Sequence, residues 1–215
     1  MLRFALLLLA AYLLGSLSGS LLLGRLRGVD IRTQGSGNAG GTNAFRTQGW
    51  RFALAVVAID VGKGALAAWL ALRVAEPLPR LPVDVQALAC GLAAMAGHAW
   101  PLFFGFRGGK GAGTLVGALA VAWPLSLAFV LPTWLLMLAG TGYVGLATVL
   151  AAGSLVPAAL LLPPQGPSAR MTFAVVAAVF ITFTHRGNLE RVRAGTEHRF
   201  ERARLFRRRG GRDGR

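Results

Sequence analysis

The chain has almost no lysine, although it is strongly basic. Of its 23 Lys and Arg residues only Lys63 and Lys110 are lysine, and the formal net charge is +15. Both lie in glycine-flanked polar segments, 60–64 and 107–111, that border long apolar stretches. A compact ammonium group beside glycine suits a phosphate oxygen, because glycine lets backbone N–H groups approach an anion closely. Both lysines are therefore candidate anion ligands, and a structural ion pair between Asp60 and Lys63 is the alternative for Lys63.

Cysteine and histidine are also scarce. The single cysteine, Cys90, excludes an intrachain disulfide, and its apolar surroundings indicate a small buried hydrophobic residue. The three histidines are scattered, with no pair at metal-ligand spacing, so we expect no metal site. A nucleotide is not implied either, because Gly111 follows Lys110 where a P-loop needs serine or threonine.

Charged residues make up only 14% of the chain, against about 25% in an average soluble domain. Hydrophobic residues reach 54%, and the mean hydropathy is +0.57. The first apolar stretch, Leu2–Leu23, exceeds the core of a signal peptide and is predicted to be a retained span. The composition predicts an all-α polytopic membrane protein. We expect one integral-membrane domain over residues 1–198 and a basic cytoplasmic tail over 199–215.

The arginines predict the orientation. Residues 24–51 carry five arginines against one aspartate, and residues 185–215 carry eleven against four acidic residues. The link at 73–84 is balanced, with two of each sign. By the positive-inside rule, the first link and the C-terminus are cytoplasmic and the N-terminus is outside. The tail follows a span directly, so contact with anionic lipid is favoured over nucleic-acid binding.

The number of crossings depends on one nearly uncharged run, Thr114–Leu162. Spans are expected at 4–23, 50–72 and 85–97, and the last apolar stretch is 171–184. Since Lys110 and the tail are both placed inside, an odd number of crossings must fill the run. Three short helices, broken near Pro132 and near Gly140–Gly142, give about seven crossings in total. One long span with re-entrant pieces, five in total, is the alternative.

Three polar segments fall at the expected cytoplasmic boundary. The first, Gly35–Arg46, is rich in glycine and offers hydroxyl, amide and guanidinium donors, but no regular amphipathic helix is expected over 24–48. The second, Gly97–Gly111, joins an aromatic half to a basic glycine loop. In the third, His185–Glu197, helical spacing would place His185 and Asn188 on one face. Donors concentrated beside a membrane favour an anion site.

These segments resemble the signatures of the PlsY family, the membrane-integral bacterial glycerol-3-phosphate acyltransferases that depend on acyl phosphate. The family patterns are S-G-N-x-G-A-T-N-x-x-R, G-H-x-x-P-x-F-x-x-F-[KR]-G-G-K-G and H-R-x-N-[IL]-x-R-[LV]-x-x-G-T-E. The chain matches them, in order, at 36–46, 97–111 and 185–197, and its Asp60–Gly64 segment also agrees. Gly41 replaces the usual alanine, which leaves the first loop freer, and the tail after Arg199 lies outside the matched segments.

The resemblance implies a reaction. An acyl group passes from acyl phosphate to the 1-hydroxyl of sn-glycerol 3-phosphate, giving lysophosphatidic acid and phosphate, the first acylation of phospholipid synthesis. It implies no metal or organic cofactor and a bacterial inner-membrane location with the site facing the cytoplasm. It also implies membrane lipid and a soluble acyl-phosphate-forming acyltransferase as partners, and no nucleic acid.

The resemblance also implies site residues. Phosphate binding and catalysis are placed on Ser36, Arg46, Lys110, His185 and Asn188. Substrate binding is extended to Gly37, Asn38, Gly40, Thr42, Asn43, Lys63, His98, Gly108, Gly109, Gly111 and Glu197. Within this set, His98 and Glu197 are expected mainly to hold the loops together, and His185 is either a base or a hydrogen-bond donor.

Two other classes compete with this interpretation. An anion transporter would explain Asp60 and Lys63 at membrane depth, but the chain shows no inverted repeat. A non-catalytic scaffold would use the basic tail to recruit a partner, but it leaves the first two polar segments unexplained.

Overall fold

The computed structural model describes residues 1–79, 81–162 and 167–200, so most of the predicted tail lies outside the described residues. Within those ranges the protein is helical, and its only strand-like pairing is an isolated bridge between Leu78 and Leu81. The first half contains α1 (Leu2–Gly15), α2 (Gly19–Leu26), α3 (Gly41–Gln48), α4 (Trp50–Val74) and α5 (Val83–Ala99). The second half contains α6 (Ala112–Ala122), α7 (Leu127–Thr141), α8 (Val144–Gly153), α9 (Leu155–Leu161), α10 (Pro167–Thr184) and α11 (Arg186–Arg193). Short 3₁₀ turns occupy Ile31–Thr33, Leu102–Phe104 and Pro124–Ser126.

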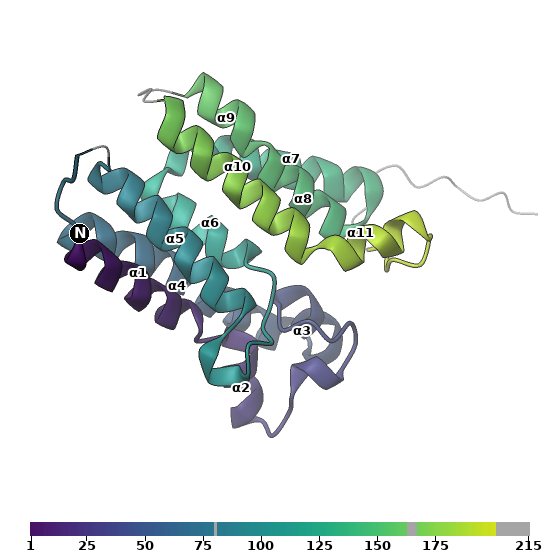
Figure 1. The fold of residues 1–215 in the computed structure, drawn as a ribbon. Helices are drawn as coiled ribbons and strands as arrows, with labels where there is room; N and C mark the ends of the chain where they lie inside the picture. The colour runs from purple at the N-terminus through teal and green to yellow at the C-terminus, as the bar shows by residue number, and fades with distance from the viewer. Residues whose placement is uncertain (80, 163–166, 201–215) are drawn as a thin grey trace, which may run out of the picture.

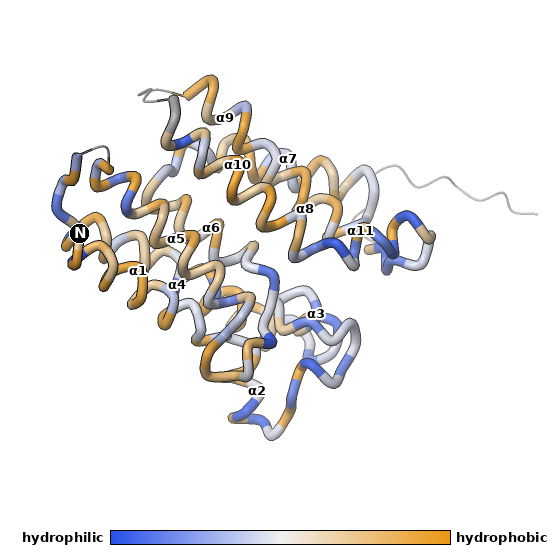
Figure 2. The backbone as a smooth tube through the Cα atoms, in the orientation of Figure 1, coloured by the Kyte–Doolittle hydropathy of each residue, from blue (hydrophilic) through white to orange (hydrophobic). Residues whose placement is uncertain are grey.

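The long helices form two packed groups (Figure 1). Helices α1, α4, α5 and α6 pack against one another, and α7 to α10 form the second group, joined to the first through α5–α10 and α6–α7 contacts. The short helices α3 and α11 lie at the same end of the bundle. Hydrophilic residues gather at that end, around α3, α11 and the loop before α6 (Figure 2). The three polar segments therefore meet at one end of an otherwise apolar body.

Four helical segments are long and apolar enough to cross a membrane on their own: Trp50–Val74, Val83–Phe104, Pro124–Thr141 and Val144–Leu161. Helices α1 and α2, bent by 44° at their junction, form a fifth if they count as one span. Two shorter apolar helices, Ala112–Ala122 and Ala169–Thr184, accompany them within the described residues. The all-α polytopic prediction is confirmed. Seven crossings would require both short helices to cross as well, so that number and the orientation stay predictions.

The position of one predicted break is wrong. Helix α7 continues through Pro132, and the chain breaks instead at Trp123, directly before the 3₁₀ turn that Pro124 opens. Membrane helices tolerate internal proline because neighbouring groups satisfy the freed backbone carbonyl. The second break is where the glycines predicted it, with Gly142 in the left-handed region at φ 76°. Three apolar segments thus fill the uncharged run, as expected.

The first polar loop contains more helix than expected. Helix α2 reaches Leu26, and α3 forms within the glycine-rich segment. An eight-residue helix is marginal in isolation. It forms here because it packs on α4, where Ala44 and Phe52 are buried together with Ile31. The expectation of no regular amphipathic helix over 24–48 is therefore wrong, because tertiary packing stabilises helix in this segment.

Glycine brings α4 and α6 into backbone contact. A Cβ added at Gly64 would overlap the backbone of Thr114, and one added at Gly117 would overlap the carbonyl of Val61. Small residues at such crossings let membrane helices approach closely, so that packing substitutes for a hydrophobic driving force. This contact fixes α6 against α4 just beyond the loop that carries Lys110.

Candidate functional site

A cavity of about 780 Å³ opens at the polar end, and all three polar segments line it. Its apolar remainder is lined mainly by α4, α6, α7 and α8. The predicted site residues in its lining are Ser36, Asn38, Gly40, Thr42, Asn43, Arg46, His98, Lys110, Gly111, His185, Asn188 and Glu197. The predicted residues outside its lining are Gly37, Lys63, Gly108 and Gly109. Residues up to 161 positions apart in the chain thus share one cavity.

The first loop is tied together by Asn43. This side chain is 1% exposed, and its Oδ1 accepts a hydrogen bond of 2.9 Å from the backbone N–H of Ser36. Its Nδ2 donates to the carbonyls of Ile31 (3.2 Å) and Gln34 (2.9 Å). Ser36 sits between Gly35 and Gly37, which both have positive φ (57° and 72°). Asn43 therefore shapes the loop, as expected, and the two glycines supply the backbone conformation that presents Ser36.

Arg46 extends from α3 to the cavity, and its guanidinium has no polar partner among the described residues. Its Nε is buried and makes no hydrogen bond, and no ion pair involves its guanidinium in the described ranges 1–79, 81–162 and 167–200. Burial lowers the pKa of Arg46, and the positive charge of Arg191 adds to that effect while Glu197 opposes it. A partly buried guanidinium without a partner for its donors is costly unless an anion completes it, so Arg46 is suited to bind one.

Lys110 begins a chain of polar contacts into the third segment. Its ammonium donates to Asn188 Oδ1, Asn188 Nδ2 donates to Glu197 Oε1 at 2.7 Å, and Arg191 Nε donates to Glu197 Oε2 at 2.6 Å. Glu197 therefore fixes the Asn188 amide with its oxygen toward Lys110. Burial, then the charges of Arg191 and Arg46, lower the pKa of Lys110 to about 8. The ammonium remains the main form at neutral pH, and its hydrogen-bonded partner in this chain is a neutral amide.

His185 lies one residue beyond α10, and one of its ring nitrogens is occupied. Nδ1 is 2.8 Å from the carbonyl oxygen of Ile181, which can only accept a hydrogen bond, so Nδ1 carries the proton. Burial, and then the charge of Lys110, lower the pKa of His185 to about 4. The ring is therefore neutral at pH 7, with an unprotonated Nε2. Within the cavity His185 is a hydrogen-bond acceptor and a weak base, not a donor through Nε2.

Lys63 occupies a different environment. Its ammonium lies 3.0 Å from Asp60 Oδ1 and 2.8 Å from His98 Nδ1, and it donates to the carbonyls of Gly15 (2.8 Å) and Leu17 (3.1 Å). The Lys63 side chain is 3% exposed. These four partner atoms surround its three N–H donors. The contacts favour the alternative expected for Lys63, a structural ion pair that holds the bend between α1 and α2, and its substrate-binding role stays a prediction.

Gly108 and Gly109 also have structural roles. Their N–H groups donate to the carbonyls of Ala99 (3.1 Å) and His98 (3.0 Å) at the end of α5, so these amides do not face an anion. A Cβ at Gly108 would overlap the His98 carbonyl, and one at Gly109 would overlap the His98 ring. The two glycines allow the Lys110 loop to lie directly on His98. His98 thereby connects that loop to the Asp60–Lys63 pair, as its expected loop-holding role requires.

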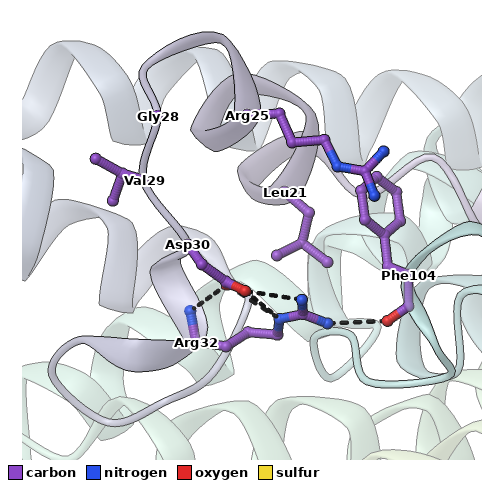
Figure 3. A pocket seen from close by; sticks show the side chains of 7 residues that line it. All are labelled: Leu21, Arg25, Gly28, Val29, Asp30, Arg32 and Phe104. Atoms are coloured by element: carbon purple, nitrogen blue, oxygen red, sulfur yellow. Dashed lines mark hydrogen bonds and ion pairs between the residues drawn. The ribbon is translucent and has the colours of Figure 1, made fainter.

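A second, smaller cavity of about 300 Å³ lies beneath α2 and contains none of the predicted residues (Figure 3). Of its two guanidinium groups, that of Arg32 already has ionic and hydrogen-bonding partners. Arg32 is paired with Asp30 (2.8 Å) and donates to the Phe104 carbonyl (2.9 Å), and Arg25 lies over the Phe104 ring at 4.3 Å. These contacts brace the first loop against the segment that follows α5.

Comparison with known proteins decides the family. The model of the glycerol-3-phosphate acyltransferase family matches residues 5–195. The chain belongs to this family. The glycerol-3-phosphate acyltransferase of Synechococcus sp. (strain CC9902) is 45% identical over 202 residues, covering 93% of this chain and 96% of the relative. That of Chlorobaculum parvum is 37% identical over 226 residues, covering 93% and 97%.

Solved structures of the acyltransferase family have the same fold. The crystal structure of PlsY, an integral membrane glycerol 3-phosphate acyltransferase, in its glycerol 3-phosphate form is 33% identical and covers 92% of this chain and 95% of its own. The TM-score is 0.82. The lysophosphatidic acid form of PlsY gives a TM-score of 0.77 at 34% identity. The protein is thus an integral-membrane glycerol-3-phosphate acyltransferase of phospholipid biosynthesis, and its resemblance to the PlsY family is confirmed.

Several residues that shape this acyltransferase site were not among those predicted from the sequence. Arg191 holds Glu197, and Thr184 Oγ1 donates to the Lys110 carbonyl at 3.0 Å. Arg191 lies within the third motif, so the motif pattern could have indicated it as a site residue. Thr184 and Phe200, which also lines the cavity, lie outside the motif segments, so only the tertiary structure shows them.

Proposed function

We propose that the protein transfers an acyl group from acyl phosphate to the 1-hydroxyl of sn-glycerol 3-phosphate, releasing lysophosphatidic acid and inorganic phosphate. The observation that carries the proposal is the composition of the large cavity. Arg46, Lys110, Ser36 and Asn188 gather at one end, and apolar side chains line the rest. Both proposed substrates are phosphates, and one of them carries a hydrocarbon chain. PlsY itself was crystallised in glycerol 3-phosphate and lysophosphatidic acid forms, which supports the choice of acceptor and product.

The apolar part of the cavity suits an acyl chain. Gly145 abuts Asn188 at the polar end, and Ala152, seven residues further along the chain through α8, lines the deep part. At 1.5 Å per residue, this places the deep lining about 10 Å from Asn188. Leu115, Val130 and Trp134 complete the apolar lining. The acyl chain would enter this region while its phosphate remains with the cations.

In the proposed reaction, the acceptor hydroxyl oxygen forms a bond to the acyl carbon as the bond from that carbon to the phosphate oxygen breaks. An acyl phosphate is already activated, so alignment of the two anions and stabilisation of the leaving phosphate supply most of the catalysis. Lys110 and Arg46 provide the positive charge, and Ser36 and Asn188 provide hydrogen bonds. These four residues are the proposed ligands of the two phosphate groups.

The proton of the acceptor hydroxyl goes to a substrate phosphate in this proposal. A phosphate monoester has its second pKa near 6, whereas burial lowers the pKa of His185 to about 4. The phosphate is therefore the stronger base of the two. His185 Nε2 instead accepts a hydrogen bond from the hydroxyl and orients it for attack.

We place the enzyme in the bacterial inner membrane with its site facing the cytoplasm. The support is the basic character of the polar end, since arginine and lysine favour the cytoplasmic side. A soluble enzyme that makes acyl phosphate is the partner that this chemistry requires. We propose residues 1–198 as the catalytic domain and the segment from 199 as a basic tail whose first residues, Arg199 and Phe200, pack against that domain.

The test is product formation by the purified protein in lipid nanodiscs with labelled glycerol 3-phosphate. Parallel reactions receive either palmitoyl phosphate or palmitoyl-CoA. Lysophosphatidic acid from palmitoyl phosphate alone is the expected result. Product from the CoA ester alone would overturn the donor while keeping the acyltransferase. Absence of product from both donors, with the protein folded, would overturn the reaction, and phosphate uptake into liposomes would then test transport.

A further inference from the structure

The last described residues of the chain return to the cavity. The backbone N–H of Phe200 donates to the Gly142 carbonyl at 2.9 Å, and the Arg199 guanidinium lies 4.7 Å from the Tyr143 ring centroid. These two contacts anchor the segment on the turn between α7 and α8. The Phe200 side chain then reaches α3, with its ring centroid 6.2 Å from that of Phe45. The segment therefore bridges two walls of the cavity.

The guanidinium of Arg46 lies over the aromatic ring of Phe200. The Arg46 guanidinium carbon lies 4.9 Å from the Phe200 ring centroid, and both residues line the cavity. A cation above an aromatic face is attracted by the ring quadrupole, more strongly when water is excluded. The Arg46 side chain has no hydrogen bond or ion pair in the described part of the chain, so the ring is its specific contact there.

The kind of contact that holds the Arg46 guanidinium determines whether its donors remain free to bind a phosphate. A guanidinium donates hydrogen bonds in its own plane, whereas an aromatic ring holds it through its face. A carboxylate partner would position Arg46 equally well, but it would occupy the donors and cancel the charge. A ring leaves all five N–H donors and the full charge available.

We propose that Phe200 is a positioning residue for Arg46, holding the guanidinium by its face so that its N–H donors remain free for a substrate phosphate. This inference rests on the proposed phosphate-binding role of Arg46. It extends the functional site beyond the third motif, which ends at Glu197, into the segment that the motifs leave out.

The experiment compares the parent protein with Phe200→Leu, which keeps bulk but removes the ring, and Phe200→Trp, which keeps an aromatic face. The matched control is Phe183→Leu. Phe183 makes the same type of contact with Arg186, at 4.3 Å, but lies outside the cavity lining and is half exposed. Thermal unfolding in nanodiscs checks that every variant is folded.

With saturating palmitoyl phosphate, Phe200→Leu is expected to raise KM for glycerol 3-phosphate roughly three- to thirty-fold, the range that a cation–π contact corresponds to. The kcat should change by less than about twofold, because the lost contact acts on binding. Phe200→Trp should restore KM, and Phe183→Leu should leave both constants unchanged. A KM for Phe200→Leu equal to that of the parent would overturn the proposal, as would a defect that Phe200→Trp does not relieve.

An Arg46→Gln background sharpens the test. Glutamine carries no charge for the ring to attract, so Phe200→Leu should there raise KM less than about twofold further. If the fold-increases in KM of the two single variants multiply fully in the double variant, Phe200 acts independently of Arg46, and the proposal is overturned.

Calorimetric titration of the nanodisc protein with glycerol 3-phosphate alone separates this inference from the proposed reaction. Weaker binding by Phe200→Leu, restored in Phe200→Trp, would support the inference even if no acyl transfer were seen. Equal binding by parent and Phe200→Leu would overturn the inference even if acyl transfer were demonstrated.

Discussion

The two lysines stand in similar sequence contexts, and the fold gives them opposite surroundings. Lys63 is enclosed by a carboxylate, a histidine and two carbonyls contributed by α1, α4 and α5. Lys110 lies beside the neutral amide of Asn188 at the cavity, with Arg46 also contributing positive charge there. A cation whose donors are filled stabilises a fold, whereas a cation with donors to spare can bind an anion. The difference is made by packing partners, not by the neighbouring glycines.

Removing the ammonium of Lys110 should have the largest effect on activity. We expect Lys110→Ala to lower kcat/KM for glycerol 3-phosphate roughly a hundred- to a thousand-fold, the size found when a key electrostatic contact is lost. The measurement is steady-state acyl transfer in nanodiscs with palmitoyl phosphate. Thermal unfolding of the same preparation is the control, and it should be unchanged. Activity near the parent level would remove Lys110 from the site.

Removing the ammonium of Lys63 should act mainly on stability. Lys63→Met leaves the Asp60 carboxylate buried without its cation, and breaking a buried pair costs about 3–5 kcal/mol. We expect a clearly lower thermal unfolding temperature. The matched control is the double variant Asp60→Asn with Lys63→Met, which removes both charges and should recover part of the loss. If Lys63→Met were as stable as the parent but inactive, Lys63 would belong with Lys110 as a substrate ligand.

The orientation of Asn188 should have a smaller effect. Glu197→Gln replaces a carboxylate that accepts from both Asn188 and Arg191, so the amide loses its fixed direction. Hydrogen bonds to charged groups contribute about 1.5–3 kcal/mol, so kcat/KM should fall roughly ten- to a hundred-fold. Glu190→Gln, on the helix α11 that carries Asn188 and Arg191, is the control and should behave as the parent. Equal kinetics in both variants would contradict the positioning role of Glu197.

The mildest expected change is the pH dependence. Burial lowers the pKa of Lys110 to about 8, and the form that binds phosphate in the proposed site is the protonated one. Above pH 7, where glycerol 3-phosphate is already a dianion, its KM should therefore be steady up to pH 8 and rise as the pH increases through that value. His185, with its pKa lowered to about 4, should add no inflection between pH 6 and 8. In a Lys110→Arg variant the rise above pH 8 should disappear, because arginine does not titrate there.

The motifs predicted much of the site because phosphate chemistry restricts which residues can serve. Ser36, Arg46, Lys110, His185 and Asn188 were all expected at one site, and the cavity brings them together. The contacts of Lys63 could not be predicted in this way. Two of its partners are the carbonyls of Gly15 and Leu17, which lie 48 and 46 residues away in the chain. They reach the lysine because the chain bends between α1 and α2.

Pro132 also read as a helix break, but α7 continues through this exposed residue, and the conformation of Trp123 makes the break instead. The glycines at 108 and 109 suggested backbone N–H groups that face an anion. These N–H groups instead donate to carbonyl oxygens at the end of α5, and no local sequence pattern indicates that contact. Composition predicts what a segment can do, and tertiary contacts decide which of those options is realised.

The glycine contact between α4 and α6 sets a dimension of the site. Helix α6 begins two residues after Lys110, and α4 carries Val57 and Val61 in the cavity wall. Since Gly64 and Gly117 let the two backbones touch, the spacing between that wall and the lysine is as small as two helices permit. A single methyl group at either glycine would push the two helices apart, although neither glycine lines the cavity. The width of the site thus depends on two residues that make no contact with its interior.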